Sequence, residues 1–200
     1  MSGAKACNVT DLEVKRQFVH LFLGFSIALM LFIFEPIFGK LVVVPLLLGI
    51  LFLLLLQNYK DNPLSKFLLE HFERDRDKEK FPYKGAILYG LGSSIPILLL
   101  DIRKACAIIA ILSVGDAVST LIGKFYGTLR VGHKSLEGCL AFLVSSFFAA
   151  LIFLPELPFL AFLLAFLGAL VELFSPIDDN LAVPIFLTFF YIIISNLHLL

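Results

Sequence analysis

The 200-residue chain is 60% hydrophobic and only 16% charged, with 16 basic and 16 acidic residues. Soluble domains are usually about half apolar and about a quarter charged, so this composition excludes an ordinary soluble protein. The apolar residues come in long runs, which is typical of chains that cross a lipid bilayer. Three cysteines, Cys7, Cys106 and Cys139, form no CxxC pair, and an odd number argues against a disulfide framework. The first thirteen residues lack the features of a cleavable signal peptide, so none is expected.

Seven apolar runs predict seven transmembrane helices, several of them shorter than the roughly 20 residues that a perpendicular helix needs. The expected spans lie at about 17–34, 38–56, 85–100, 105–122, 136–154, 157–174 and 181–197. We therefore expect an all-α, polytopic integral membrane protein in which residues 1–200 form a single transmembrane domain.

A long polar segment, residues 57–84, separates the second expected span from the third. Asn62 and Pro63 are typical of a helix start. The apolar residues that follow at helical spacing are Leu64, Phe67, Leu68 and Phe72. This pattern predicts an interfacial amphipathic helix. The mixed-charge run at 73–80 is most simply a solvated surface.

The distribution of basic residues predicts the topology. With seven spans, the N-terminus and the segments at 57–84, 123–135 and 175–180 share one face, which carries thirteen of the sixteen Lys and Arg residues. The other face carries only Lys40, Arg103 and Lys104. Because cytoplasmic loops are enriched in Lys and Arg, the first face is predicted to be cytoplasmic.

Polar residues at the start of the first expected span, Lys15, Arg16 and His20, have two interpretations. Cations at the cytoplasmic end of a span are ordinarily membrane anchors, but they also suit phosphate binding. His20 lies one turn inside the span, where a polar group should have a partner.

Asp116, within the fourth expected span, is a candidate functional residue. A carboxylate inside a span is costly unless it is paired or binds a cation. The alternative is a structural ion pair with a neighbouring Lys or Arg. The small residues around Asp116, including Gly115, allow another helix or a ligand to approach closely.

The residues that follow this span combine glycines with cations, as a phosphate chain requires. Ser135 is placed to cap the fifth expected span, with Glu137 in its first turn, and a helix N-terminus favours bound phosphate. The spacing is not that of a Walker A loop, so a nucleotide would be held in another way. The candidate nucleotide-binding residues are Arg16, Gly123, Lys124, Gly127, His133, Lys134, Ser135, Glu137 and Gly138.

A further acidic group joins the sixth and seventh expected spans. Glu172 lies near the end of the sixth span, and Asp178, Asp179 and Asn180 form the turn. Asp and Asn are common in turns for their local hydrogen bonds, so this turn alone does not indicate a functional site. Together with Asp116, these residues offer hard oxygen ligands on one face, which suits Mg²⁺ held jointly with phosphates. We expect Asp116, Glu172 and Asp179 as the metal ligands.

These motifs resemble those of the CTP-dependent polyprenol kinases, the family of dolichol kinase, phytol kinase and a CTP-using diacylglycerol kinase. The resemblance lies in Gly115-Asp116, in residues 133–138 (His-Lys-Ser-Leu-Glu-Gly), in Val171-Glu172 and in residues 179–184. Arg16 with His20 is similar to the N-terminal signature of the family, although Gln17 replaces its usual Lys. Tyr83-Lys84-Gly85 resembles a Tyr-Arg-Gly motif. The short chain favours an archaeal or bacterial source.

The resemblance implies transfer of the γ-phosphate of CTP to the hydroxyl of a dolichol-like or polyprenol-like membrane alcohol, with Mg²⁺ as cofactor. Asp116 and Gly123 match motif positions that the family needs, and Arg16 matches its essential arginine. Asp116, Glu172 and Lys134 are the expected catalytic residues. The expected partners are CTP, a membrane lipid alcohol and the bilayer, and no nucleic acid. The active face would be the cytoplasmic side of the cell membrane, or of the endoplasmic reticulum in a eukaryote.

Two alternatives stay open at this stage. A phosphatidate cytidylyltransferase-like enzyme also uses CTP and Mg²⁺, but it releases pyrophosphate instead of CDP. A small transporter or a structural membrane protein is less favoured, because transporters commonly show paired inverted halves and this sequence shows none. The sequence does not distinguish dolichol, geranylgeraniol, phytol and diacylglycerol as acceptors, and it gives no oligomeric state.

Overall fold

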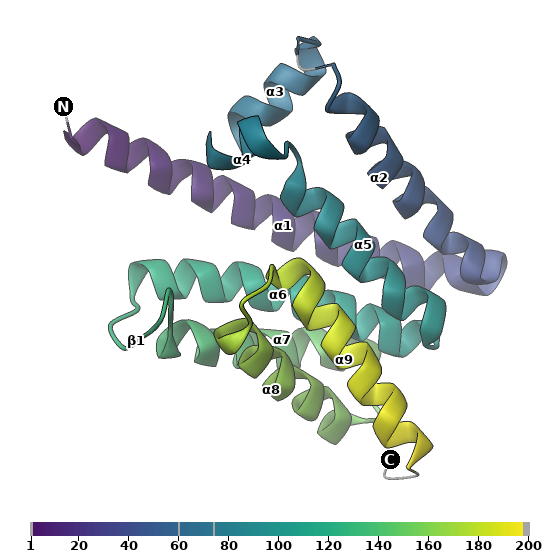
Figure 1. Ribbon diagram of the computed structural model, residues 1–200. Coiled ribbons are helices and arrows are strands. Elements are labelled where there is room, and N and C mark those ends of the chain that lie inside the picture. Colours follow the sequence, from purple (N-terminus) through teal and green to yellow (C-terminus); the bar gives the residue numbers. More distant parts are fainter. Residues whose placement is uncertain (1, 60, 74, 198–200) are drawn as a thin grey trace.

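The computed structural model describes residues 2–59, 61–73 and 75–197, and these are almost entirely helical (Figure 1). The helices in chain order are α1 (Ser2–Phe38), α2 (Val44–Leu56), α3 (Pro63–Phe72), α4 (Asp75–Lys80), α5 (Lys84–Leu99), α6 (Ile102–Phe125), α7 (Leu136–Phe153), α8 (Pro158–Phe174) and α9 (Asp179–Asn196). A 3₁₀ segment, η1 (Gly39–Val43), joins α1 to α2. Two short antiparallel strands, β1 (Arg130–Val131) and β2 (Lys134–Ser135), form a hairpin between α6 and α7.

Each of the seven expected spans coincides with an α-helix, but the number of membrane crossings stays a prediction. Within the described residues, four stretches are long and apolar enough to cross a bilayer: Asp11–Leu56, which runs from α1 into α2, and the helices α6, α7 and α9. The apolar helices α5 and α8 have 16 and 17 residues. At 1.5 Å per residue they extend about 24–26 Å, which is less than the roughly 30 Å of a hydrocarbon core.

Helix α6 is the centre of the bundle, with α1, α5, α7, α8 and α9 packed around it. Every side chain from Ala105 to Leu112 is completely buried. A helix that is apolar on all sides in this way is expected in the interior of a bundle. By contrast, α1 and α2 expose large apolar side chains, among them Phe22, Ile37 and Leu48. These outer surfaces suit contact with lipid.

Glycines allow close helix crossings. A methyl group at Gly92 of α5 would clash with the main-chain carbonyl oxygen of Asn180 at the start of α9. A methyl group at Gly138 of α7 would lie 2.9 Å from the carbonyl oxygen of Ser119 in α6. Small residues at such positions allow helix backbones to approach one another. Both crossings adjoin residues of the candidate site.

The polar segment between α2 and α5 folds back onto the bundle. As predicted, α3 begins at Pro63, and the side chain of Asn62 accepts a hydrogen bond of 2.9 Å from the Leu64 amide. The hydroxyls of Tyr83 and the buried Ser65 lie 2.6 Å apart. Glu73 is buried and accepts a 2.9 Å hydrogen bond from the Tyr83 amide. The expectation of a solvated run at 73–80 is therefore wrong for Glu73, because this side chain holds the left-handed residue Tyr83 (φ 60°) at the entry to α5.

The two predicted faces lie at opposite ends of the bundle. The first half of α1, the start of α5, the hairpin and the α8–α9 turn surround one cavity. At the other end, Lys40 donates a 2.7 Å hydrogen bond to the Ile97 carbonyl, and Arg103 lies 3.8 Å from Glu156. The segments that carry most of the cations thus gather at one end. Its assignment to the cytoplasm stays a prediction from the charge distribution.

Candidate active site

A polar cavity of about 570 Å³ lies at the cation-rich end of the bundle. Residues from α1, α4, α5, α6, the hairpin, α7, α8 and α9 line it. The lining includes these residues expected from the sequence: Arg16, Asp116, Gly123, Lys124, His133, Lys134, Ser135, Gly138, Glu172 and Asp179. Residues from five helices (α1, α6, α7, α8 and α9) and from the hairpin therefore meet in a single site.

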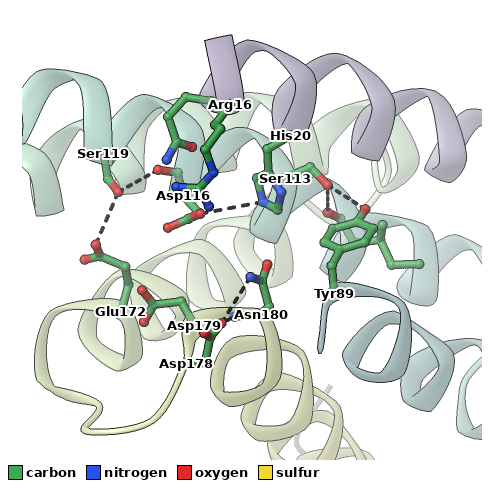
Figure 2. Close-up of polar contacts among 12 residues, drawn as sticks. Arg16, His20, Tyr89, Ser113, Asp116, Ser119, Glu172, Asp178, Asp179 and Asn180 are labelled. Atoms are coloured by element: carbon green, nitrogen blue, oxygen red, sulfur yellow. Dashed lines mark hydrogen bonds and ion pairs between the residues drawn. The ribbon is translucent and has the colours of Figure 1, made fainter. Parts of the chain in front are cut away.

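Among the described residues, the carboxylates of Asp116 (α6), Glu172 (α8) and Asp179 (α9) form a close group (Figure 2). One oxygen of each lies within 4.8 Å of the corresponding oxygens of the other two. Carboxylates this close repel one another unless a cation lies near them. Ser119 supports the group, because its hydroxyl is 3.2 Å from Glu172 Oε1 and 3.1 Å from the Asp116 carbonyl oxygen.

Lys134 supplies a cation to two of these acids. Its Nζ lies 2.9 Å from Glu172 Oε1 and 2.6 Å from Asp179 Oδ2. Burial alone would lower the pKa of Lys134, but the carboxylates of Asp179 and Glu172 outweigh burial and raise this pKa above its ordinary value. Lys134 is therefore protonated at physiological pH, and it joins β2 to α8 and α9.

The acidic group has the donor atoms that a divalent cation requires. Glu172 Oε2 and Asp179 Oδ1 are buried and have no hydrogen-bond partner among the described residues. A buried carboxylate oxygen without a partner costs free energy, and coordination of a metal ion removes this cost. Mg²⁺ prefers a small number of carboxylates and completes its coordination with water and phosphate oxygens. The residues present therefore fit Mg²⁺.

Further charges surround the acids at the cavity wall. Arg16 of α1 lies 3.3 Å from Glu13, one turn before it. Lys84, the first residue of α5, lies 3.6 Å from Asp178. Lys84 and Gln17 line the cavity, although neither is among the site residues predicted from the sequence. The available signals for Lys84 were its position directly before a span on the predicted cytoplasmic face and the resemblance of Tyr83-Lys84-Gly85 to a family motif.

The N-terminus of α7 also borders the cavity. Ser135 caps this helix as predicted, accepting a 3.1 Å hydrogen bond from the Gly138 amide. A Cβ at Gly138 would lie 3.3 Å from the Cα of Gly123, so the two glycines bring α6 and α7 together here. The arrangement leaves the wall between these helices free of bulky side chains.

Two predicted nucleotide-binding residues, Gly127 and Glu137, are not part of the cavity lining. Glu137 accepts hydrogen bonds of 2.9 and 3.1 Å from the amides of Thr128 and Leu129, and it also bonds the Thr128 hydroxyl. A Cβ at Gly127 would lie 2.6 Å from Ser135 Oγ. Both residues therefore shape the hairpin that presents Lys134.

Comparison with known proteins gives two relatives. The chain is 33% identical over 183 residues to the uncharacterized protein MJ1137 of Methanocaldococcus jannaschii, which covers 88% of this chain and 91% of that protein. It is 35% identical over 131 residues to the dolichol kinase of Saccharomyces cerevisiae, which covers 60% of this chain but 24% of the kinase. No protein-family model matches, and no solved structure matches significantly.

Proposed function

The chain belongs to the same family as the archaeal protein MJ1137, and we propose that it is a multi-pass membrane kinase that phosphorylates a lipid alcohol. The partial similarity to yeast dolichol kinase supports the reaction class. The observation that carries the proposal is the group of three carboxylates, within 4.8 Å of one another, in a cavity that also contains Arg16 and Lys134. We propose CTP as the phosphate donor and an isoprenoid alcohol as the acceptor.

In this proposal Asp116, Glu172 and Asp179 would hold Mg²⁺. When bound, the ion would neutralise charge on the nucleotide phosphates. The protein itself contributes mainly position and positive charge, which is what phosphoryl transfer requires of an enzyme. Lys134 already lies between two of the acids, so it is close to any phosphate that approaches them.

The remaining cations of the cavity suit the rest of the triphosphate. Arg16 of α1, Lys84 of α5 and Lys124 of α6 line the cavity, together with the imidazole of His133 in the hairpin. The N-terminus of α7 adds backbone amides and the positive end of a helix dipole. Gly123 and Gly138 leave space for a nucleotide to approach this terminus.

The reaction transfers one phosphoryl group. The oxygen of the lipid alcohol forms a bond to the γ-phosphorus, the bond from that phosphorus to the bridging oxygen breaks, and CDP leaves with this oxygen while one proton is released. The cavity lies at the end of apolar helices, where a lipid hydroxyl and a water-soluble nucleotide can meet.

The proposal is tested with purified protein in lipid nanodiscs. γ-Labelled CTP or ATP is supplied with Mg²⁺ and with dolichol, geranylgeraniol, phytol or diacylglycerol. We expect label in the lipid with CTP and an isoprenoid alcohol, and much less with ATP. Equal turnover with ATP would exclude the proposed donor, and no labelled lipid with any acceptor would exclude the kinase.

A further inference from the structure

A largely buried polar cluster lies beside Asp116 and outside the cavity lining, and the side chain of His20, its outermost member, is 19% exposed. It consists of His20 from α1, Tyr89 from α5 and Ser113 from α6 (Figure 2). His20 Nε2 lies 3.6 Å from Asp116 Oδ2, which is too far for a hydrogen bond. This nitrogen is buried and has no hydrogen-bond partner within the described part of the chain. A buried nitrogen without a hydrogen-bond partner, 3.6 Å from a carboxylate of the candidate site, needs a physical explanation, and a bound ligand is one such explanation.

The orientation of His20 is set by its neighbours. The ring of Tyr89 packs edge-on against the imidazole, with centroids 5.1 Å apart and planes at 81°. Tyr89 Oη and Ser113 Oγ lie 2.9 Å apart, and Ser113 donates its hydrogen to the Ile109 carbonyl at 2.7 Å. Because Ser113 has a single hydrogen, Tyr89 is the donor in their bond. The cluster therefore fixes Tyr89, and Tyr89 in turn supports the ring of His20.

We propose that His20 Nε2 and Asp116 Oδ2 together bind the hydroxyl group of the lipid acceptor. This inference rests on the proposed kinase function and adds the place of the acceptor. A hydroxyl donates one hydrogen bond and accepts others, so it can donate to the carboxylate and accept from the imidazole N–H. Two atoms 3.6 Å apart can share one oxygen at about 2.8 Å, the usual hydrogen-bond distance, once the buried Nε2 is uncovered.

The surroundings of His20 and Asp116 indicate different routes of approach for the lipid alcohol and the nucleotide. Asp116 lines the polar cavity, whereas His20 does not. On the turns of α1 next to His20, Val19, Phe22 and Leu23 are exposed apolar side chains. A lipid alcohol therefore approaches Asp116 from the apolar side, along α1, and a nucleotide approaches it through the cavity.

The test compares His20→Gln and His20→Ala with His71→Gln, a matched control on α3 outside the cavity. Loss of one neutral hydrogen bond predicts a KM for the alcohol that is about threefold to tenfold higher in both His20 variants. The KM for CTP and the affinity for Mn²⁺ should stay unchanged, and His71→Gln should match the unaltered protein. Tyr89→Phe should raise the KM for the alcohol by a smaller factor, because Tyr89 acts only through His20.

Melting temperatures show whether each variant is folded, and His20→Gln retains a polar side chain if His20→Ala unfolds. An unchanged KM for the alcohol, or an equal rise in the KM for CTP, would overturn the inference and assign His20 to the support of Asp116. A binding measurement without CTP separates this result from failure of the kinase proposal. This measurement is photo-crosslinking by a diazirine-labelled isoprenoid alcohol, with geranylgeraniol as the competitor. If affinity for the hydroxyl is lost, His20→Ala should need about threefold to tenfold more competitor than the unaltered protein for the same loss of crosslinking. Identical competition curves would contradict the subsite even where no phosphorylation is seen.

Discussion

Lys134 Nζ lies 2.6 Å from Asp179 Oδ2, and this ion pair joins the hairpin to the first turn of α9. The same amine lies 2.9 Å from Glu172 Oε1, so the protein places its own cation between two of the three clustered acids. A metal ion that binds these acids must share them with Lys134 or displace it. Metal binding, stability and the position of Lys134 are therefore coupled.

Lys134→Met should make stability depend on divalent cations. Removal of one partner of a fully buried ion pair costs about 3–5 kcal/mol, and less is expected here because the side chain of Lys134 is 28% exposed. We expect a lower melting temperature without metal, recovery with Mg²⁺, and tighter Mn²⁺ binding by electron paramagnetic resonance. Lys66→Met, which removes an exposed partner of Asp61, is the control. A melting temperature that does not respond to Mg²⁺ would argue against a metal site at these acids.

Asp116→Asn should abolish activity without loss of the fold. The change retains the shape of the side chain and removes its charge, and a neutral amide is less costly to bury than a carboxylate. Loss of charge stabilisation worth about 3–4 kcal/mol lowers the rate by a factor of hundreds. Kinase rate and melting temperature are measured together, with Asp61→Asn as the control. A folded and active variant would remove Asp116 from the catalytic machinery, whereas an unfolded one would favour a structural role.

Gly92→Ala should displace a residue of the candidate site, although Gly92 itself does not line the cavity. The added methyl group would meet the carbonyl oxygen of Asn180, so α9 must move at its first turn, where Asp179 lies. Overpacking of this kind costs about 1–3 kcal/mol, and displacement of Asp179 should also lower the kinase rate. Gly49→Ala is the matched control, because a Cβ there has no atom within 4 Å in the described structure. Equal melting temperatures and rates for the two variants would show that the α5–α9 crossing tolerates a side chain.

The helices could be predicted from the sequence because apolar runs and end signals are local. Asn62 before Pro63, and Ser135 before Leu136, mark the helix starts that the structure contains. Membrane crossing is harder to derive, since α5 and α8 are apolar but short. Their place in a bilayer depends on tilt and on neighbouring helices, which a single sequence does not record.

The candidate site was only partly predictable for a similar reason. Acidic residues such as Asp116 and Glu172 are conspicuous within apolar runs. The pairing of Lys134 with Asp179 depends on the crossing of α7, α8 and α9, so residue spacing could not give it. Glu137 was predicted to contact a nucleotide, and in the structure its carboxylate accepts hydrogen bonds from the Thr128 and Leu129 amides, in the loop before β1, which residue spacing does not reveal.

The charge distribution predicts that the cavity faces the cytoplasm. In a variant without native cysteines, Arg130→Cys should be protected from an impermeant thiol reagent in intact cells and should react after lysis. Glu156→Cys, at the opposite end of the bundle, should react in intact cells. The reverse pattern would invert the topology and place the cavity outside.

The fate of each phosphate of CTP tests the central claim most directly. The purified protein is incubated in nanodiscs with Mg²⁺, geranylgeraniol and CTP labelled at either the α- or the γ-phosphate, and the lipid and nucleotide products are separated. A lipid kinase predicts label in the lipid from γ-labelled CTP alone, with α-labelled CDP released. Label in the lipid from α-labelled CTP, with release of pyrophosphate, would contradict the kinase and identify a cytidylyltransferase.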